Sequence, residues 1–343
     1  MRTGKFFFTA TALAAVLVSA TLCFGKNDID PNAAALVEKV KSELVPLDFN
    51  QAVEHSPTVV DYFKYYGIHA ENSEHLFGTV KAGGYNLAAH VFKPASSRAT
   101  VIIVHGYCDH AGIWKHVIKS LLEQQYTVAI YEQPGHGLSD GPRASINSFS
   151  EYVTVLDTFI GLCRENLDGP YHLAAHSMGG GIAVDYLLNN RDTPLDKVVL
   201  VAPLIRSVAW NMSGFGSRLA KPFINSVPRK FRKNSDDREF LAFSKKDPLQ
   251  TRSVPMKWVD AHRKWEKGIR KAKTSGKSVK ILQGMSDTTV KWKYNLPFLE
   301  KKFANVDVYK IKKGGHQLIN ETPLVREIVI NEIINCFNSS PSK

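Results

Sequence analysis

The sequence predicts an α/β protein built on a mostly parallel eight-stranded sheet that is flanked by helices. The first indication is an alternation along the chain, in which short runs rich in β-branched residues are separated by amphipathic stretches of helical length. The second is that these runs are apolar throughout, which is typical of strands covered by helices on both faces. The third is an interval, residues 205–275, that contains no such run and is too long for a simple connection.

The eight predicted strands divide the chain into parts. Residues 26–74 form an N-terminal helical extension, and 75–204 together with 276–343 form the core. Residues 205–275 form an inserted helical cap, or lid, over the strand ends, where ligands bind in open α/β sheets. The predicted strands are Phe77–Lys81, Tyr85–Phe92, Thr100–Gly106, Thr127–Gln133, Tyr171–Ser177, Lys197–Pro203, Ser278–Gly284 and Val306–Lys313.

Residues 1–25 have the composition of a secretory signal peptide, with cleavage expected near residues 20 to 25. Arg2 and Lys5 precede the apolar stretch Phe6–Val18, and small residues follow it. An uncleaved membrane anchor is the alternative, because the apolar character continues to Phe24 and approaches bilayer-spanning length. We expect an exported protein that is periplasmic or secreted, or membrane-associated if the segment is retained. Cleavage would leave an odd number of cysteines, which no disulfide framework can pair completely.

The predicted cap is strongly basic. Residues 205–275 hold 18 Lys or Arg and 6 Asp or Glu, an excess of 12 that equals the formal net charge of the whole chain. Aromatic residues are interspersed with these cations, a combination that suits peripheral contact with an anionic membrane surface while an acyl chain enters beneath. A solvated basic face that keeps the protein soluble is the alternative. Nucleic-acid binding is not expected, because no recognition motif accompanies the charge and the export signal argues against it.

The segment YHLAAHSMGGG, Tyr171–Gly181, places a serine between an apolar strand and a glycine-rich helix start. On such a sharp turn the hydroxyl lies above the sheet, and the next N–H lies at a helix N-terminus, where developing negative charge is stabilised. The residues two positions away must be small, and they are Ala175 and Gly179. Ser177 is therefore the candidate nucleophile. In isolation, a helix start that binds nothing is the alternative.

A serine nucleophile needs a histidine base that is oriented by a carboxylate, and in this architecture the order along the chain is Ser, acid, His. LQGMSDTTV supplies Asp287 after one predicted strand, and KKGGHQLINE supplies His316 after the last one. Asp307 is a weaker candidate for the acid, because it begins a strand and faces the wrong end of the sheet. Four other histidines near the same edge are interpreted as structural: His105, His110, His136 and His176.

An oxyanion hole requires two N–H donors, one after the nucleophile and one after the first parallel strand. The backbone amides of Met178 and Tyr107 occupy these positions, the latter within HGYCDHAGIW. An ordinary tight turn at Gly106 is the alternative for the second position. No metal is expected, since no Cys/His cluster has zinc-like spacing.

These motifs together resemble the α/β-hydrolase fold family. The similarity extends from about Phe77 to Phe337 and is closest to the branch that contains monoacylglycerol lipases, lysophospholipases and serine aminopeptidase-like hydrolases. It implies a serine hydrolase with a lid over the site and no cofactor. Two departures are notable: Ala175 replaces the usual glycine, and Tyr107 is bulky where lipases of the branch often have a small residue. The blocks that carry the resemblance are HGYCDHAGIW, YEQPGHGLSDGPR, AAHSMGGGIA, FSKKDPL, LQGMSDTTV and GGHQLINE.

The sequence therefore predicts a serine hydrolase that cleaves carboxylic esters of lipid type, a lysophospholipid or a monoacylglycerol, through an acyl-enzyme. A serine peptidase or amidase of the same fold is the alternative, and it would need an acidic group near the site to hold a substrate α-amine. A non-catalytic binding protein on this fold is a third hypothesis, but such proteins usually lack a triad member and none is missing here. The expected partner is a small-molecule or lipid ester substrate.

Overall fold

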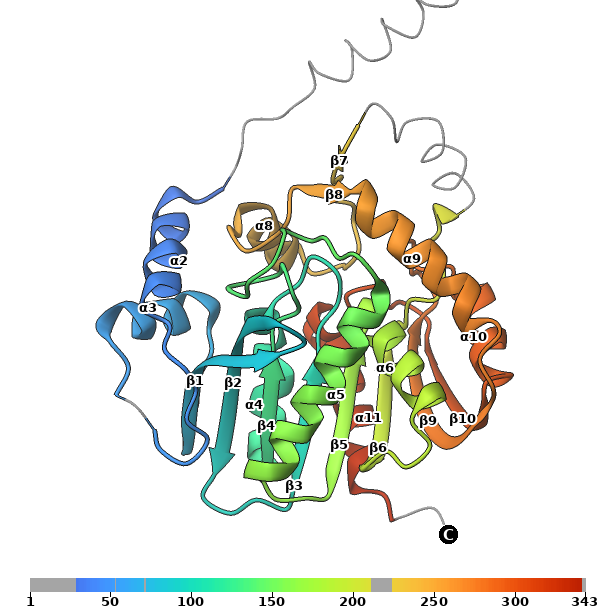
Figure 1. Cartoon of the computed structure of the whole chain (residues 1–343), viewed down its shortest axis with the longest axis horizontal. Coiled ribbons are helices and arrows are strands. Elements are labelled where there is room, and N and C mark those ends of the chain that lie inside the picture. Colours follow the sequence, from blue (N-terminus) through green and yellow to red (C-terminus); the bar gives the residue numbers. More distant parts are fainter. Residues whose placement is uncertain (1–28, 53, 71, 211–223, 341–343) are drawn as a thin grey trace, which may run out of the picture.

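The computed structural model describes residues 29–52, 54–70, 72–210 and 224–340. The predicted signal peptide and residues 211–223 of the predicted cap lie outside these ranges. Eight strands form one sheet in the order β1-β2-β4-β3-β5-β6-β9-β10 (Figure 1). Two of the strand pairs are antiparallel, β1 with β2 and β2 with β4, and the other five are parallel. The mostly parallel eight-stranded sheet is thus confirmed.

The observed strands coincide with the predicted ones to within a few residues. The largest differences are at β1, β9 and β10, which begin three or four residues earlier than predicted because the apolar run does not extend to their first residues. The bounds are β1 Ser73–Ala82, β2 Tyr85–Pro94, β3 Ala99–Val104, β4 Tyr126–Tyr131, β5 Tyr171–His176, β6 Leu195–Val201, β9 Ser275–Gly284 and β10 Phe303–Ile311.

Helices cover both faces of the sheet. In Figure 1, α5 (Phe149–Asn166) and α6 (Met178–Asn189) lie in front, and α4 (Lys115–Glu123) and α11 (Pro323–Asn338) lie behind, while α10 (Trp292–Glu300) packs near the β10 edge. The central strands are buried on both sides, and each face forms its own apolar cluster. This arrangement explains why the strand runs are apolar throughout rather than alternating.

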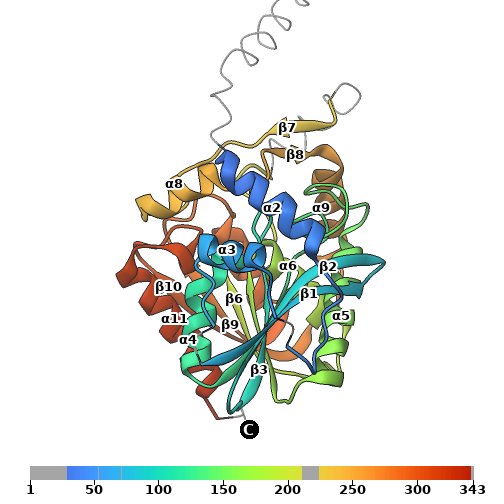
Figure 2. The same ribbon diagram turned by 90° about the vertical axis from the view of Figure 1, so that its left-hand side faces the viewer.

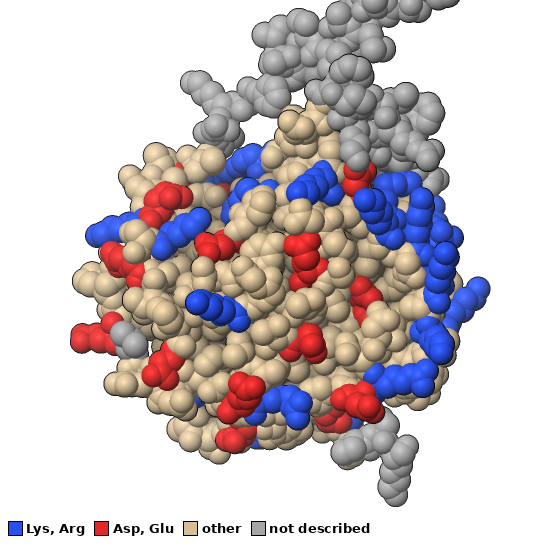
Figure 3. Space-filling model, in the orientation of Figure 1, with Lys and Arg blue, Asp and Glu red and all other residues tan. Residues whose placement is uncertain are grey.

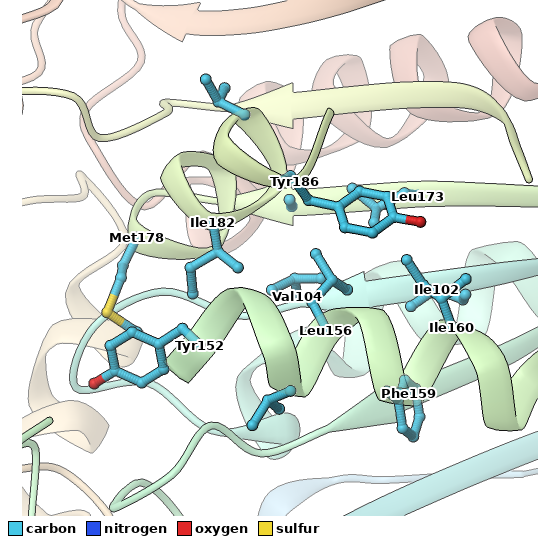
Figure 4. Packing of buried hydrophobic residues seen from close by; sticks show 14 of the residues in the cluster. Ile102, Val104, Tyr152, Leu156, Phe159, Ile160, Leu173, Met178, Ile182 and Tyr186 are labelled. Carbon is cyan, nitrogen blue, oxygen red and sulfur yellow. The ribbon is translucent and has the colours of Figure 1, made fainter. Parts of the chain in front are cut away.

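Figure 4 shows the cluster under α5 and α6. Leu156 and Ile160 of α5 pack with Val104 and Ile102 of β3, and all four side chains are buried. Burying an aliphatic side chain of this kind contributes about 1.5 to 3 kcal/mol relative to leaving it exposed. The cluster continues to Met178 at the start of α6, so the turn that carries Ser177 stands directly on the core.

The N-terminal extension folds into two helices, α2 (Pro31–Glu43) and α3 (Pro57–Tyr66). Asp30 and Ser56 cap them by accepting backbone N–H groups, and each helix starts with proline, which lacks the N–H that would be unsatisfied there. Tyr62 of α3 stacks on Phe77 of β1 at 5.9 Å between ring centroids. The extension therefore covers the β1–β2 end of the sheet, as Figure 2 shows from the side.

The segment between β6 and β9 lies over one end of the sheet (Figures 1 and 2). It contains helices α8 (Arg238–Lys246) and α9 (Met256–Ile269) and also a small antiparallel ribbon of β7 (Ser226–Pro228) and β8 (Ser253–Pro255). The sequence predicted helices alone here, because strands of three residues ending in proline are too short to show an alternating pattern. Among the described residues no helix is long and apolar enough to cross a bilayer.

Candidate active site

Ser177 stands on the turn between β5 and α6. Its φ of 52° and ψ of −114° lie outside the regions that L-residues favour, a conformation that costs on the order of 1 to 3 kcal/mol and is held by the surrounding packing. The close approach of helix and strand requires glycine two residues later, since a Cβ on Gly179 would lie 2.2 Å from the Val104 carbonyl oxygen. The local sequence thus fixes the hydroxyl at the carboxyl end of β5.

The structure brings Ser177, His316 and Asp287 together in one hydrogen-bonded chain. His316 Nε2 lies 2.9 Å from Ser177 Oγ, and His316 Nδ1 lies 2.8 Å from Asp287 Oδ2. Asp287 follows β9 and His316 follows β10, so three strand ends supply the three groups. Because the carboxylate accepts from Nδ1–H, the Nε2 atom is left to accept the serine proton.

The Asp287 carboxylate is held as an anion. Its Oδ1 accepts the N–H groups of Thr289 at 2.7 Å and Val290 at 3.0 Å, and its Oδ2 also accepts from the Gln283 side chain at 3.2 Å. Burial favours the neutral acid, but the charge and hydrogen bond of His316 and the two backbone N–H groups outweigh it. The pKa of Asp287 is consequently lowered from its ordinary value of 3.8.

The two backbone amides predicted as oxyanion donors each follow the end of a central strand. Met178 is the first residue of α6, and Tyr107 follows β3 in the neighbouring loop. Neither N–H donates a backbone hydrogen bond within the described part of the chain. The Tyr107 ring stacks on Trp258 of α9 in the cap at 3.9 Å, and its hydroxyl donates to Ala144 O, between β4 and α5, at 2.7 Å.

A second buried cluster lies behind the histidine, and the sequence analysis did not identify it. His176 Nε2 donates to the backbone oxygen of His316 at 3.1 Å, and its Nδ1 lies 3.4 Å from Asp109 Oδ2. The side chain of Gln317 donates to Asp109 at 3.2 Å. Burial raises the pKa of Asp109, but His176, His105 and nearby Arg229 outweigh this and lower it to about 2. The sequence did contain an indication of this cluster, because Asp109 lies close to the candidate oxyanion donor Tyr107 and Gln317 directly follows His316.

The remaining histidines of the sheet edge have structural contacts, in agreement with their interpretation from sequence. His105 Nε2 accepts the Gln133 N–H at 2.8 Å, and His136 Nδ1 lies 2.9 Å from Pro134 O. His110 forms a fully buried ion pair with Asp247, whose other oxygen accepts the hydroxyl of Tyr66 at 2.8 Å. Asp247 follows α8, so this pair connects the cap, the loop after β3 and the N-terminal extension.

A cavity of about 320 Å³ lies beside the three hydrogen-bonded side chains, and we call it the triad-side cavity. Its core wall includes Asp109, Thr288 and Gln317, the last two being chain neighbours of Asp287 and His316. Its cap wall includes Arg229 and the residues that follow it, and α8. The Asp109 carboxylate and Ser177 Cβ lie 2.7 Å and 3.2 Å from the point where a Cβ on Gly106 would stand, so one wall residue of the cavity lies close to the serine.

The fold and this arrangement of serine, histidine and aspartate define the protein as an α/β hydrolase. The chain belongs to the family described as serine aminopeptidase, S33 (Hydrolase_4), whose model matches residues 95–323. The resemblance inferred from the motifs is thereby confirmed.

Two curated relatives carry names of lipid hydrolases. A monoacylglycerol lipase from Mycolicibacterium smegmatis is 33% identical over 121 residues, which are 35% of this chain and 42% of that protein. The phospholipase YtpA from Bacillus subtilis is 31% identical over 107 residues, 31% of this chain and 41% of that protein. The matched region therefore spans less than half the length of either relative.

Solved structures show the same fold. A soluble variant of monoglyceride lipase from Saccharomyces cerevisiae superposes with a TM-score of 0.68 at 18% identity, covering 81% of this chain and 99% of that one. A monoacylglycerol lipase from Paleococcus ferrophilus gives a TM-score of 0.62 at 21% identity, covering 73% and 97%.

Proposed function

We propose that the protein is a serine hydrolase that cleaves carboxylic esters of lipid type through an acyl-enzyme. The observation that carries the proposal is the continuous hydrogen-bonded chain from Ser177 through His316 to Asp287, at 2.9 and 2.8 Å. The lipase names of the sequence relatives support the choice of lipid esters. These names favour a monoacylglycerol or a phospholipid, and the motif resemblance favours a lysophospholipid among the latter.

The geometry supports a two-step reaction. His316 Nε2 takes the proton of Ser177 as the hydroxyl oxygen attacks the ester carbonyl, and the N–H groups of Met178 and Tyr107 stabilise the resulting oxyanion. Collapse of the intermediate expels the alcohol, which receives the proton from His316. Water then attacks the acyl-enzyme by the same proton path and releases the carboxylic acid. Asp287 remains ionised throughout and stabilises the imidazolium that forms.

Charge near the site favours ester over aminopeptide substrates. None of the six carboxylates of the predicted cap lines the triad-side cavity, whose one acidic group among the described residues is Asp109. That carboxylate already accepts from Gln317 and faces His176, and the cap wall beside it is cationic. A substrate ammonium group would meet repulsion there, whereas an uncharged or anionic ester would not.

A substrate panel tests the proposal. We expect hydrolysis of p-nitrophenyl esters and monoacylglycerols, and kcat/KM at least 100-fold lower for aminoacyl anilides. A fluorophosphonate probe should label the protein at Ser177, as located by peptide mass spectrometry. Efficient anilide cleavage would favour the peptidase alternative, and absence of labelling together with absence of esterase activity would favour a non-catalytic binding protein.

The outer face of the cap suits peripheral contact with an anionic membrane. In Figure 3, Lys and Arg side chains gather along the right-hand edge, over α9 and α10. The exposed lysines on and just after α9 include Lys264, Lys267 and Lys271. A polybasic surface contributes about 1 kcal/mol per cation close to an anionic bilayer. We propose that this surface brings the enzyme to lipid and takes no part in bond cleavage.

Replacing Lys264, Lys267 and Lys271 together with glutamine is expected to weaken binding to vesicles containing anionic phospholipid by about 10-fold or more, by the additivity of such contacts. Raising salt from 0.1 to 1 M shortens the screening length from about 10 to about 3 Å and should have the same effect on the native protein. Hydrolysis of a soluble neutral ester should change less than twofold in either case. The control variant replaces three exposed cations of α2 and α4 with glutamine, namely Lys39, Lys41 and Lys119. Unchanged vesicle binding in both triple variants would favour the alternative that the basic face is merely solvated.

A further inference from the structure

The triad-side cavity is lined by polar and charged side chains as well as apolar ones, whereas an acyl-chain tunnel would be apolar throughout. Hydroxyl and amide side chains from core and cap line it, among them Ser207, Thr288 and Thr289. Its volume of about 320 Å³ is at the lower end of the range for small-molecule sites, roughly 300 to 1,000 Å³. Such a cavity beside a nucleophile suits the alcohol portion of an ester better than the acyl chain.

Five cations line the same cavity, and most have no acidic partner. Lys233 pairs with Asp236 at 2.6 Å. For the part of the chain that the structure describes, no ion pair is found for the other four, Arg229, Lys230, Arg232 and Lys245. The single carboxylate in the wall, Asp109, is already engaged by Gln317 and His176. The cavity therefore carries a net positive charge that no described protein group neutralises.

Arg229 is the cation best placed to bind a ligand. It is half-buried, and its Nη1 is anchored by donating to Gln250 Oε1 at 2.7 Å and to Thr251 O at 3.2 Å. The Phe231 ring lies 4.6 Å from its guanidinium carbon and further restricts it. Its Nε and Nη2 groups donate to no other described residue, which leaves a pre-oriented pair of donors of the kind that binds phosphate or carboxylate.

The charge of Arg229 also reaches the loop that carries the candidate oxyanion donor. Burial raises the pKa of the Cys108 thiol to about 11, and Arg229 acts against this increase. Burial also raises the pKa of the Asp109 carboxyl, and Arg229 helps His176 and His105 to lower it. A group bound at Arg229 would therefore lie close to the loop that carries Tyr107.

We infer that the triad-side cavity is a subsite for a phosphate monoester on the alcohol portion of the substrate, with Arg229 as its main ligand. The inference rests on the proposed ester hydrolysis and narrows its substrate to acyl esters of a glycerol phosphate type. The phosphate dianion matches several unpaired cations, and the neighbouring hydroxyl groups suit the glycerol oxygens. Placing an acyl chain there instead would strip water from cations without giving them a partner.

The test compares two short-chain esters that stay monomeric in water, 1-butyrylglycerol and 1-butyrylglycerol 3-phosphate, so that membrane attraction plays no part. We expect the native enzyme to prefer the phosphate ester in kcat/KM by at least 10-fold. Arg229→Gln should lower kcat/KM for the phosphate ester by about 10- to 100-fold, because it removes hydrogen bonds to a charged group. The same substitution should change kcat/KM for the neutral ester less than threefold. Arg232→Gln, at an exposed residue of the same wall, should produce a smaller loss of the same kind and provides the test if Arg229→Gln fails to fold.

Lys39→Gln is the matched control, because it removes one positive charge from the exposed face of α2 outside the cavity. It should leave both substrates unchanged. If the native enzyme hydrolyses both esters equally and neither cavity variant changes their ratio, the phosphate subsite is wrong while the proposed esterase function stands.

Binding measurements separate the inference from the catalytic proposal. Calorimetry of the native protein with sn-glycerol 3-phosphate should show binding that Arg229→Gln weakens at least 10-fold and that Lys39→Gln leaves unchanged. That result would support the subsite even if neither ester were hydrolysed. Absence of hydrolysis would overturn the proposed function alone. The cavity would instead be a free-phosphate site if inorganic phosphate bound as tightly as glycerol phosphate and kcat/KM were the same for both esters. That result would overturn the substrate subsite.

Discussion

Replacing Ser177 with alanine is expected to lower kcat for ester hydrolysis by about 10⁵- to 10⁶-fold, the loss typical of a serine nucleophile that acts as one unit with its base. The Oγ atom is the group that would form the acyl-enzyme, and it lies 2.9 Å from His316 Nε2. The measurement is the burst and steady-state rate with a p-nitrophenyl ester, together with labelling by a fluorophosphonate probe, which the variant should not take up.

The variant should keep its fold, because the Ser177 hydroxyl has a hydrogen bond to His316 alone among the described residues. The strained backbone turn is maintained by Gly179 and the strand packing, which the substitution leaves intact. The thermal midpoint should stay within about 3 °C, as expected for a change below 1 kcal/mol. Ser286→Ala, at an exposed serine beside Asp287, is the matched control and should retain full activity. Wild-type hydrolysis by Ser177→Ala would show that the site is elsewhere.

Local patterns were sufficient to predict the sheet and the three hydrogen-bonded side chains. The strands could be found because burial on both faces makes each one a continuous apolar run, such as Ala99–Val104. Ser177, Asp287 and His316 could be found because parallel strands end at one edge of the sheet, which brings together residues that follow different strands. No long-range information was needed beyond the order of the strand ends along the chain.

Contacts between distant segments could not be predicted in the same way. The His110–Asp247 ion pair joins residues 137 positions apart, and neither residue has a neighbour that identifies its partner. The charge count of the cap likewise could not distinguish the cations that line the cavity from those on the outer surface. The structure places Arg229 and Arg232 in the wall of the triad-side cavity and Lys267 on the outer face of α9, two locations that imply different partners.

Replacing Asp287 with asparagine is expected to lower kcat by about 10³- to 10⁴-fold, less than the loss in Ser177→Ala. In the native protein the carboxylate accepts from His316 Nδ1 at 2.8 Å, which leaves Nε2 free to accept the serine proton. The asparagine amide group can donate to Nδ1 instead, which shifts the imidazole proton to Nε2 and removes the base. His316→Ala, by contrast, should be nearly as damaging as Ser177→Ala.

Asp307→Asn is the control, since Asp307 was the other carboxylate considered from the sequence. Its side chain is 69% exposed and pairs with Lys280 on the neighbouring strand, remote from the hydrogen-bonded chain of Ser177 and His316. The variant should retain native activity within about twofold, as expected for an exposed ion pair. Steady-state kinetics of the two asparagine variants, measured side by side, therefore identify the acid of the triad. Loss of activity in Asp307→Asn together with native rates in Asp287→Asn would contradict the assigned site. The carboxylate that orients His316 would then lie on β10.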